Sequence, residues 1–454
     1  MTQENKKALP FKAELKADTL AREVAYRVLF RCENSGSYSN IALDAALTSS
    51  ELSNEDRRFV TRLVYGVIER SITLDYIIGK LSSRPTDKID PAAMMIIRMG
   101  LYQMIYMDRV PTHAAVDSSV ELSHKYAHKA SAFINAALRA YADRRVKIEM
   151  PSRSSEDYLC ITYGVSKDIC DIFVRDMGFE RAEKLLGAIN ESAGENPTIR
   201  VNTLKTTKEA LIASDKPYLS GAAGHETLIE TAIRAAYIPG NDEISSGLFF
   251  VQDEASQLCS RALGALPGER VLDACACPGG KSFSIAMDMQ NRGQILSCDL
   301  HKNKLSLIEE GASRLGISII QTRAQNGTVF DESIGTFDRV LCDVPCSGTG
   351  VMAKKPEIRC KKSEDLSRLP ETQKAILSNC SRYLKPGGTL VYSTCALDRS
   401  ENEDNIKAFL SSNPDFALAP FAAGKIECKE GYITLAPDEH GCDGFFICRM
   451  VKIK

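Results

Sequence analysis

The chain has 454 residues, of which 44% are hydrophobic and 26% are charged, with a formal net charge of −2. These are the proportions of a globular protein, and the length predicts about two to four domains. They exclude a disulfide-stapled miniprotein, a collagen-like fibre and a largely disordered polymer. No apolar run reaches the roughly 18 residues of a membrane helix. The polar first residues lack the apolar segment of a secretory signal, so we expect a soluble, cytoplasmic protein.

Cysteine usage argues against a metal site. The 15 cysteines include no CxxC pair, and none of the six histidines lies near a cysteine pair. Zinc-site spacing is therefore missing from the sequence, and we expect no bound metal. An odd number of thiols in a long chain of this kind also argues against a disulfide framework.

Residues 18–145 are predicted to form an all-α bundle. Apolar residues recur at helical spacing, as at Leu20, Val24, Val28 and Cys32. A very apolar helix that starts near Pro91 should be central, and two more helices are expected at 116–126 and 130–141. Residues 1–150 carry a net charge of +4 and the remainder −6, which is compatible with an RNA-facing N-terminal part.

Residues 146–245 read as a linker followed by two helices and a small α/β subdomain. The segment VKIEMPSRSS, 146–155, is the linker, and the helices are expected at 167–177 and 180–190. Short strands are expected at 198–202 and 235–238.

From residue 246 to 454, strands and helices alternate, which predicts a doubly wound, mostly parallel sheet of the α/β class. The expected helices are 281–289, 304–315 and 371–384. The expected strands are 270–274, 294–299, 318–323, 339–343, 389–394, 432–435 and 445–450.

The sequence RVLDACACPGGK predicts a ligand loop at the carboxyl end of the first of these strands. Glycines let the backbone approach a ligand, and the helix that follows offers free N–H groups. Neither a P-loop nor a GxGxxG pattern is present. Asp299 ends the next strand, where an acid can accept both hydroxyls of a ribose, and Asn326 can reach an adenine edge. Three loops at one sheet edge thus suit an adenosine-type ligand.

Two further cysteines follow strands of the same sheet. Cys346 lies in RVLCDVPCSGTG and Cys395 ends TLVYSTC, so both should lie at the ligand edge. A thiolate there can add to the 6-carbon of a cytosine, which makes the 5-carbon nucleophilic. Asp343 is placed to bind the ring nitrogen and the amine of that base. SENE at 400–403 is interpreted as a capping box without a catalytic acid.

Together these motifs resemble the RNA cytosine-5 methyltransferases of the Sun/Fmu (NOL/NOP2/Sun) type. The resemblance rests on CACPGGK, DVPCSGTG, STC followed by SENE, RVNT at 200–203 and HGCDGFF at 440–446. It implies S-adenosyl-L-methionine as the donor, Cys395 as the nucleophile and Cys346 as the thiol that assists release. It also implies a catalytic Asp343. The implied donor-binding residues are Cys275, Ala276, Cys277, Pro278, Gly279, Gly280, Lys281, Asp299, Asn326 and Asp343.

The N-terminal bundle is similar to the RNA-binding domain of the antitermination factor NusB. The combination of a NusB-like bundle with a Rossmann-like catalytic domain resembles the bacterial enzymes that act on small-subunit ribosomal RNA. Three residues depart from the family pattern: Cys277 replaces the usual Ala, Asn326 a common Asp, and Cys360 a frequent Trp. The last departure puts one stacking or packing contact in doubt.

The expected partner is ribosomal RNA, naked or immature, because the target base must leave any stack before a cysteine can reach it. No membrane partner is expected. Two alternatives stay open: a transfer RNA cytosine-5 methyltransferase, and a catalytically inert RNA-binding ribosome-assembly factor. Phosphate contacts are expected from Arg200, Lys354, Lys355 and Arg359.

Overall fold

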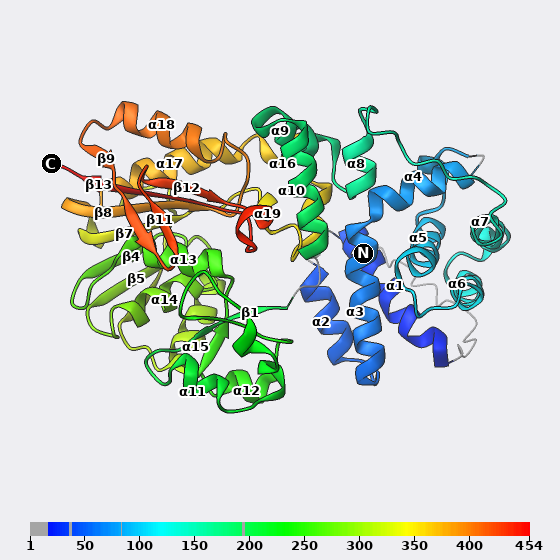
Figure 1. The fold of residues 1–454 in the computed structure, drawn as a ribbon, viewed down its shortest axis with the longest axis horizontal. Coiled ribbons are helices and arrows are strands. Elements are labelled where there is room, and N and C mark those ends of the chain that lie inside the picture. The colour runs from blue at the N-terminus through cyan, green and yellow to red at the C-terminus, as the bar shows by residue number, and fades with distance from the viewer. Residues whose placement is uncertain (1–16, 36–38, 83, 193–195) are drawn as a thin grey trace, which may run out of the picture. The chain divides into compact units, whose positions relative to one another are not determined.

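The computed structural model describes residues 17–35, 39–82, 84–192 and 196–454, so the polar segment 1–16 lies outside the described residues. The chain divides into two compact units (Figure 1). One comprises the chain up to Cys170 together with Lys355–Cys360, and the other comprises Asp171–Lys354 and Lys361–Lys454. This division differs from the predicted boundaries at 145 and 245, which stay a prediction.

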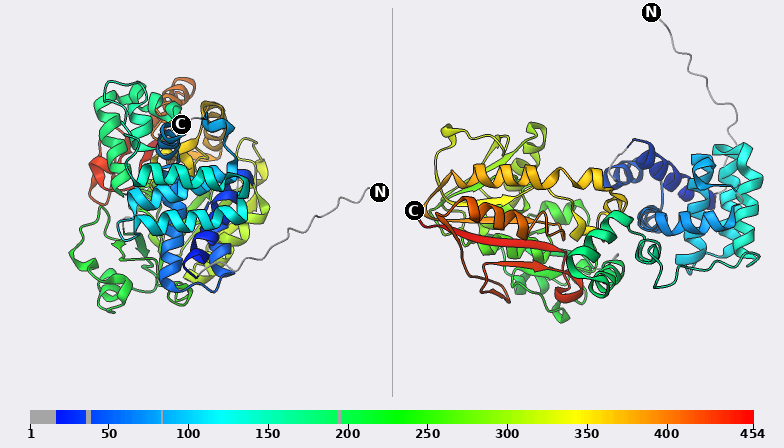
Figure 2. Two further views of the ribbon diagram at one scale, coloured as in Figure 1. Left: turned by 90° about the vertical axis from the view of Figure 1, so that its right-hand side faces the viewer. Right: turned by 90° about the horizontal axis from the view of Figure 1, so that it is seen from above.

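The first unit is a helical bundle, as the sequence predicts. α5 is its central helix, because it packs against α1, α3, α4, α6 and α7 and is buried along most of its length. Asp90 caps α5 by accepting the amide N–H of Ala93 at 3.0 Å, and Pro91 occupies the first turn. Figure 2 (left) shows α6 and α7 side by side in cyan. The helices are α1 (Ala17–Ser35), α2 (Ser39–Thr48), α3 (Asn54–Glu69), α4 (Ser71–Leu81), α5 (Pro91–Tyr106), α6 (Thr112–Tyr126), α7 (Ser131–Ala142) and α8 (Tyr158–Tyr163).

The segment Lys355–Cys360 is a distant part of the sequence that joins the bundle. The guanidinium of Arg359 donates to the carbonyl of Tyr163 at 3.1 Å, and the amide of Ser166 donates to the carbonyl of Arg359 at 2.7 Å. The sequence places this segment within the α/β domain, because nothing in its local pattern marks a contact almost 200 residues away.

The boundary between the units falls within α9 (Lys167–Met177), and the second unit continues with α10 (Phe179–Ser192) and a small antiparallel sheet in the order β2–β1–β3. Its strands are β1 (Thr198–Val201), β2 (Ala232–Arg234) and β3 (Phe249–Val251). The predicted strand at 235–238 is wrong. β1 pairs with residues 232–234 instead, and Tyr237 and Ile238 are exposed beyond the end of the pairing.

The main sheet has eight strands among the described residues, in the order β12–β13–β8–β7–β4–β5–β6, with β9 on β13. The pairs from β8 to β6 are parallel, whereas β13 is antiparallel to β8, so the predicted mostly parallel sheet is confirmed. The strands are β4 (Arg270–Asp273), β5 (Gln294–Asp299), β6 (Ile320–Ala324), β7 (Phe337–Asp343), β8 (Leu384–Thr394), β9 (Phe416–Leu418), β12 (Tyr432–Leu435) and β13 (Phe445–Lys452), with β10 (Phe421–Ala423) and β11 (Ile426–Cys428) forming a separate hairpin.

Helices cover both faces of this sheet, which confirms the doubly wound arrangement (Figure 1). α13 (Glu254–Leu263), α14 (Gly280–Asp288) and α15 (Leu305–Leu315) cover one face. α17 (Leu369–Ser381) and α18 (Glu403–Ser412) lie next to each other on the other, as Figure 2 (right) shows. The remaining short helices are α11 (Lys208–Ile212), α12 (Asn241–Ser245), α16 (Ser363–Leu366) and α19 (Pro437–His440). Within the described residues, no helix has the length and apolar character to cross a bilayer.

Candidate active site

The register between β7 and β8 brings the two predicted cysteines together. Asp343 lies opposite Ser393 at the ends of these parallel strands, so the loops that follow leave the same edge of the sheet. The sulfur atoms of Cys346 and Cys395 are 3.2 Å apart, and both residues are half-buried. The two cysteines are 49 residues apart in the sequence, and the fold brings their sulfur atoms into direct contact.

A half-buried cation and a hydroxyl orient the carboxylate of Asp343. Nζ of Lys281 donates to Oδ2 of Asp343 at 2.7 Å, and Oγ of Ser393 donates to Oδ1 at 2.8 Å. Burial lowers the pKa of Lys281, but the Asp343 carboxylate more than offsets this and raises the pKa above its usual value. Lys281 therefore stays charged, and it also lies 4.9 Å from the centre of the Phe445 ring.

Backbone contacts hold the loops that carry the thiols. The amide of Gly350 donates to the carbonyl of Cys395 at 2.9 Å, and the amide of Gly444 donates to the carbonyl of Gly350 at 2.9 Å. The side chain of Asn402, the N-cap of α18, accepts a hydrogen bond from Thr394 at 2.6 Å. The residues that precede β13 and α18 thus restrain the segments that carry the two thiols.

The environment of Cys346 favours the protonated thiol. The hydrogen bond with Cys395, burial and the nearby carboxylate of Glu401 all raise the pKa of Cys346 well above its usual value. A thiol that keeps its proton can donate a hydrogen bond across the 3.2 Å contact to the sulfur of Cys395.

The loop from Cys275 to Lys281 has the shape of a ligand cradle. It leaves the carboxyl end of β4 and opens α14, where Gly279 has a φ of +109° and no room for a Cβ, which would lie 2.5 Å from the ring of Phe283. Beneath the loop, burial raises the pKa of Asp273 to about 7. Oδ1 of this carboxyl has no hydrogen-bond partner among the described residues, while Oδ2 accepts from Ser282 at 2.6 Å.

The two adjacent parallel strands supply the other predicted ligand contacts. Oδ1 of Asp299, at the end of β5, accepts from the amide of His301 at 2.9 Å, and its Oδ2 makes no hydrogen bond to a described residue. Asn326 uses its oxygen for Thr328, while its Nδ2 donates to no described residue. A carboxylate oxygen for a ribose and an amide N–H for a base are therefore available. These residues and the glycine cradle fit an adenosine-type donor.

Two of the four predicted phosphate contacts are wrong. Arg200 and Arg359 are fully buried, so neither guanidinium is exposed to a phosphate. Arg200 lies on β1, the central strand of the small sheet, and donates to Asp288 at 2.9 Å. Lys354 is half exposed, but its ammonium already binds the carboxylates of Asp253 at 2.5 Å and Asp443 at 2.8 Å. Lys355 is exposed, and its contact with RNA stays a prediction.

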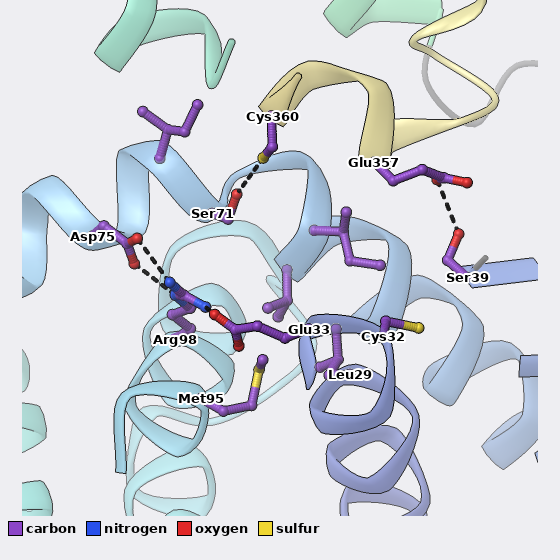
Figure 3. A pocket seen from close by; sticks show the side chains of 13 residues that line it. Leu29, Cys32, Glu33, Ser39, Ser71, Asp75, Met95, Arg98, Glu357 and Cys360 are labelled. Carbon is purple, nitrogen blue, oxygen red and sulfur yellow. Dashed lines mark hydrogen bonds and ion pairs between the residues drawn. The ribbon is translucent and has the colours of Figure 1, made fainter. Parts of the chain in front are cut away.

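A cavity of about 410 Å³ in the bundle unit lies where Cys360 replaces the tryptophan frequent in the resembled family (Figure 3). The thiol of Cys360 is 3.4 Å from Oγ of Ser71 and does not fill the space. At its floor, Arg98 binds Asp75 at 2.6 Å and Glu33 at 2.9 Å. With Glu357 also lining it, the cavity is acidic, and a nucleic acid phosphate is disfavoured there.

A second cavity of the bundle has the opposite charge. It has a volume of about 670 Å³ and lies between the start of α5 and the start of α7. Its basic side chains outnumber its one acid, Asp90, and two aromatic rings lie beside them. The basic and aromatic lining consists of Arg84, Lys88, His128, Lys129, Tyr126 and Phe133. Positive charge next to aromatic rings is typical of surfaces that bind single-stranded RNA.

Sequence reasoning missed one group of site residues and misread another. The capping box at 400–403 is wrong, because Asn402 is the N-cap of α18 and makes no side-chain cap bond. Glu401 instead binds the amide of Ser347, next to Cys346, at 2.9 Å, and so does not cap its own helix. Ser393 and Phe445 belong to quoted motifs, but only the strand register shows their contacts with Asp343 and Lys281.

Comparisons with known proteins agree along the whole chain. The family described as 16S rRNA methyltransferase RsmB/F matches residues 261–451, and the NusB family matches residues 19–143. The probable ribosomal RNA small subunit methyltransferase B of Bacillus subtilis (strain 168) is 37% identical over 451 residues, which cover 96% of this chain and 99% of the relative. The ribosomal RNA small subunit methyltransferase B of Klebsiella pneumoniae (strain 342) is 29% identical over 412 residues, which cover 88% of this chain and 91% of the relative.

Solved structures share the fold. The crystal structure of PH0851 has a TM-score of 0.78 at 24% identity and covers 94% of this chain and 98% of that one. The crystal structure of NSun6 from Pyrococcus horikoshii with SFG has a TM-score of 0.53 at 22% identity and covers 64% of this chain and 98% of that one. At these identities the likeness supports the architecture of the sheet and its flanking helices.

Proposed function

The chain belongs to the 16S rRNA methyltransferase RsmB/F family, and from this premise we propose that it methylates the 5-carbon of a cytosine in small-subunit ribosomal RNA. The proposed methyl donor is S-adenosylmethionine, and the proposed nucleophile is Cys395. The observation that carries the proposal is the contact of two thiols, 3.2 Å apart, at the ligand edge of the sheet.

The thiols take different roles in the proposed reaction. The sulfur of Cys395 adds to the 6-carbon, which moves the electrons of the ring double bond to the 5-carbon. When bound, the donor supplies the methyl group that this carbon accepts. A base then takes the 5-proton, the electrons of that C–H bond restore the double bond, and the electron pair of the bond between sulfur and the 6-carbon leaves with the sulfur of Cys395. Cys346, in contact with Cys395, assists this release by exchanging a proton at the reacting centre.

Asp343 holds the base and Lys281 holds Asp343. The carboxylate accepts hydrogen bonds from Lys281 and Ser393, which fix its plane at the edge of the site. In that orientation it can bind the exocyclic amine of cytosine, while Lys281 balances its charge. The donor would be held by the cradle from Cys275 to Gly280, by Asp299 and by Asn326.

The basic cavity of the bundle supports an RNA substrate. Its lysines and arginine can neutralise phosphates, and its two rings can stack with bases that have left a helix. Binding should therefore weaken steeply with salt. The bundle supplies affinity, and the thiol pair supplies the chemistry.

The proposal is tested with labelled S-adenosylmethionine and unmodified RNA. Small-subunit ribosomal RNA and total transfer RNA are offered separately, and 5-methylcytosine is mapped by bisulfite sequencing. We expect label in the ribosomal RNA. Label in transfer RNA alone would identify the other methyltransferase, and label in neither would identify an inert assembly factor.

Cysteine variants test the two thiol roles in the same assay. Cys395→Ala should abolish turnover but leave donor binding intact. Cys346→Ala should accumulate a covalent protein–RNA adduct, which is visible on a denaturing gel. Cys32→Ala, at another half-buried cysteine in the bundle unit, is the matched control and should behave like the unaltered protein. Free turnover by Cys346→Ala would contradict the release role.

A further inference from the structure

Glu401 is a buried carboxylate that contacts the catalytic loop although the proposed reaction assigns it no role. It is 1% exposed and precedes α18. Its Oε2 accepts the amide N–H of Ser347 at 2.9 Å and the side-chain amide of Gln373 at 2.7 Å. Ser347 directly follows Cys346, so the hydrogen bond to its amide fixes the peptide bond on the carboxyl side of Cys346.

Gln373 completes a clamp around Cys346. Its Nε2 also donates to the carbonyl of Pro345 at 3.0 Å, the residue before Cys346. The backbone is thus held on both sides of the cysteine, by Gln373 at Pro345 and by Glu401 at Ser347. The side chain of Cys346 therefore extends from a backbone that is held at the residue before it and at the residue after it.

Neighbouring elements fix the clamp itself. The hydroxyl of Tyr392 on β8 donates to the carbonyl of Glu401 at 2.6 Å. Nδ2 of Asn405 on α18 donates to Oε1 of Gln373 at 3.0 Å and to the carbonyl of Glu401 at 3.2 Å. The clamp is therefore built on rigid strand and helix positions, which place a catalytic group more reproducibly than loop contacts do.

Burying the carboxyl group of Glu401 costs folding free energy, and a helix-capping role does not account for its burial. Burial raises the pKa of Glu401, although the hydrogen bonds from Ser347 and Gln373 oppose the shift. Its Oε1 is buried without a hydrogen-bond partner among the described residues, an arrangement that destabilises a folded chain. Since Asn402 is the N-cap, the carboxylate gains its hydrogen bonds from Ser347 and Gln373, the two residues that hold the backbone around Cys346.

We propose that Glu401 is a positioning residue of the reaction: by holding the amide of Ser347, it keeps the sulfur of Cys346 against the sulfur of Cys395. The catalytic consequence rests on the proposed function, because it concerns release of the Cys395 adduct. The geometric consequence does not, since the distance between two sulfur atoms can be probed without RNA.

The substitutions follow from the two carboxylate oxygens. In Glu401→Gln, the side-chain carbonyl can occupy the site of Oε2 and keep both hydrogen bonds, while the amide occupies the unpartnered site of Oε1. In Glu401→Ala, the clamp on Ser347 is lost. Glu403→Ala is the matched control, because Glu403 lies two residues further on and its side chain, among the described residues, accepts a hydrogen bond only from Thr434, at 3.4 Å.

The RNA-free experiment measures how readily the two thiols are joined. Diamide takes up two electrons and two protons from a thiol pair, which becomes a disulfide while diamide becomes the hydrazine. Mass spectrometry then quantifies the peptide pair linked through Cys346 and Cys395. We expect rapid linkage in the unaltered protein, in Glu403→Ala and in Glu401→Gln, and at least about tenfold slower linkage in Glu401→Ala. Equal rates in all four proteins, or no linkage in the unaltered protein, would overturn the proposal.

The RNA experiment adds the catalytic readout. Glu401→Ala should lower kcat about 10–100-fold, leave donor affinity unchanged and accumulate the covalent adduct, as Cys346→Ala does. Glu401→Gln should recover most of the turnover that the alanine variant loses. If the unaltered protein formed no 5-methylcytosine while the diamide rates differed as expected, the proposed function would fail and the positioning role would stand. If methylation were normal in Glu401→Ala, the positioning role would fail.

Discussion

The close approach of Gly350 to Gly444 makes Gly350→Ala the sharpest perturbation of the catalytic loop. A Cβ on residue 350 would lie 2.0 Å from the carbonyl oxygen of Gly444 and 2.7 Å from its Cα. Both obstacles are backbone atoms of the segment that enters β13, so a rotamer change cannot relieve them. The loop between Cys346 and residue 350 must instead move by about 1 Å to reach ordinary contact distances.

This movement has two measurable costs. Overpacking of this kind destabilises a protein by about 1–3 kcal/mol, and the hydrogen bonds that join residue 350 to Cys395 and Gly444 are weakened. A displacement of about 1 Å at a reacting group lowers the rate by up to about 100-fold. Donor affinity should stay unchanged, because the glycine cradle, Asp299 and Asn326 lie on other loops.

The assay is single-turnover methylation of small-subunit ribosomal RNA, with urea unfolding of the same samples. Gly240→Ala is the control, because a Cβ there would meet no atom within 4 Å. We expect the control to match the unaltered protein in both measurements. A Gly350→Ala protein with a turnover rate within about twofold of normal and unchanged stability would refute the reasoning from the backbone contact.

Three further predictions concern a buried acid, a buried ion pair and the bundle. The pKa of Asp273 is about 7 in the folded chain and about 4 in the unfolded chain, so the native state holds an extra proton between these pH values and the free energy of unfolding falls as pH rises through that window. Asp273→Asn should remove this part of the pH dependence of the free energy of unfolding, measured by urea unfolding. An unchanged pH dependence would contradict the assignment. Arg200→Met should destabilise the fold by about 1–3 kcal/mol without changing RNA affinity at low denaturant, because Asp288 loses the buried guanidinium and keeps only its longer contact with Arg261; weaker RNA binding at normal stability would instead support a phosphate contact. Lys88→Glu with Lys129→Glu should weaken RNA binding and reduce its salt dependence, measured by fluorescence anisotropy at several salt concentrations, and an unchanged salt dependence would exclude the basic cavity as an RNA site.

Local sequence patterns predicted most of the architecture. The apolar stripes of the bundle set its helices, and the alternation of strands with helices set the doubly wound sheet, because both follow from short-range periodicity. β5 and α9 have the predicted bounds. The strand at 235–238 was misplaced because antiparallel pairing with β1, a tertiary contact, selects residues 232–234.

The proximity of the three candidate catalytic residues follows from the sequence, while their roles stay a prediction. Cys346, Cys395 and Asp343 meet because parallel strands end at a common edge. The basic residues show the limit of this reasoning, since a cation in a motif is compatible with a solvent-facing contact or with a buried ion pair. Arg200 is buried against Asp288, 88 residues away, and no local pattern marks that partner.

The most direct test of the account is to identify the atom that bonds to RNA. The Cys346→Ala protein is incubated with S-adenosylmethionine and unmodified small-subunit ribosomal RNA, the adduct is digested with nuclease and protease, and tandem mass spectrometry locates the modified residue. The account predicts a methylated pyrimidine on the sulfur of Cys395. An adduct on any other residue, or the absence of an adduct while methylation proceeds, would contradict it.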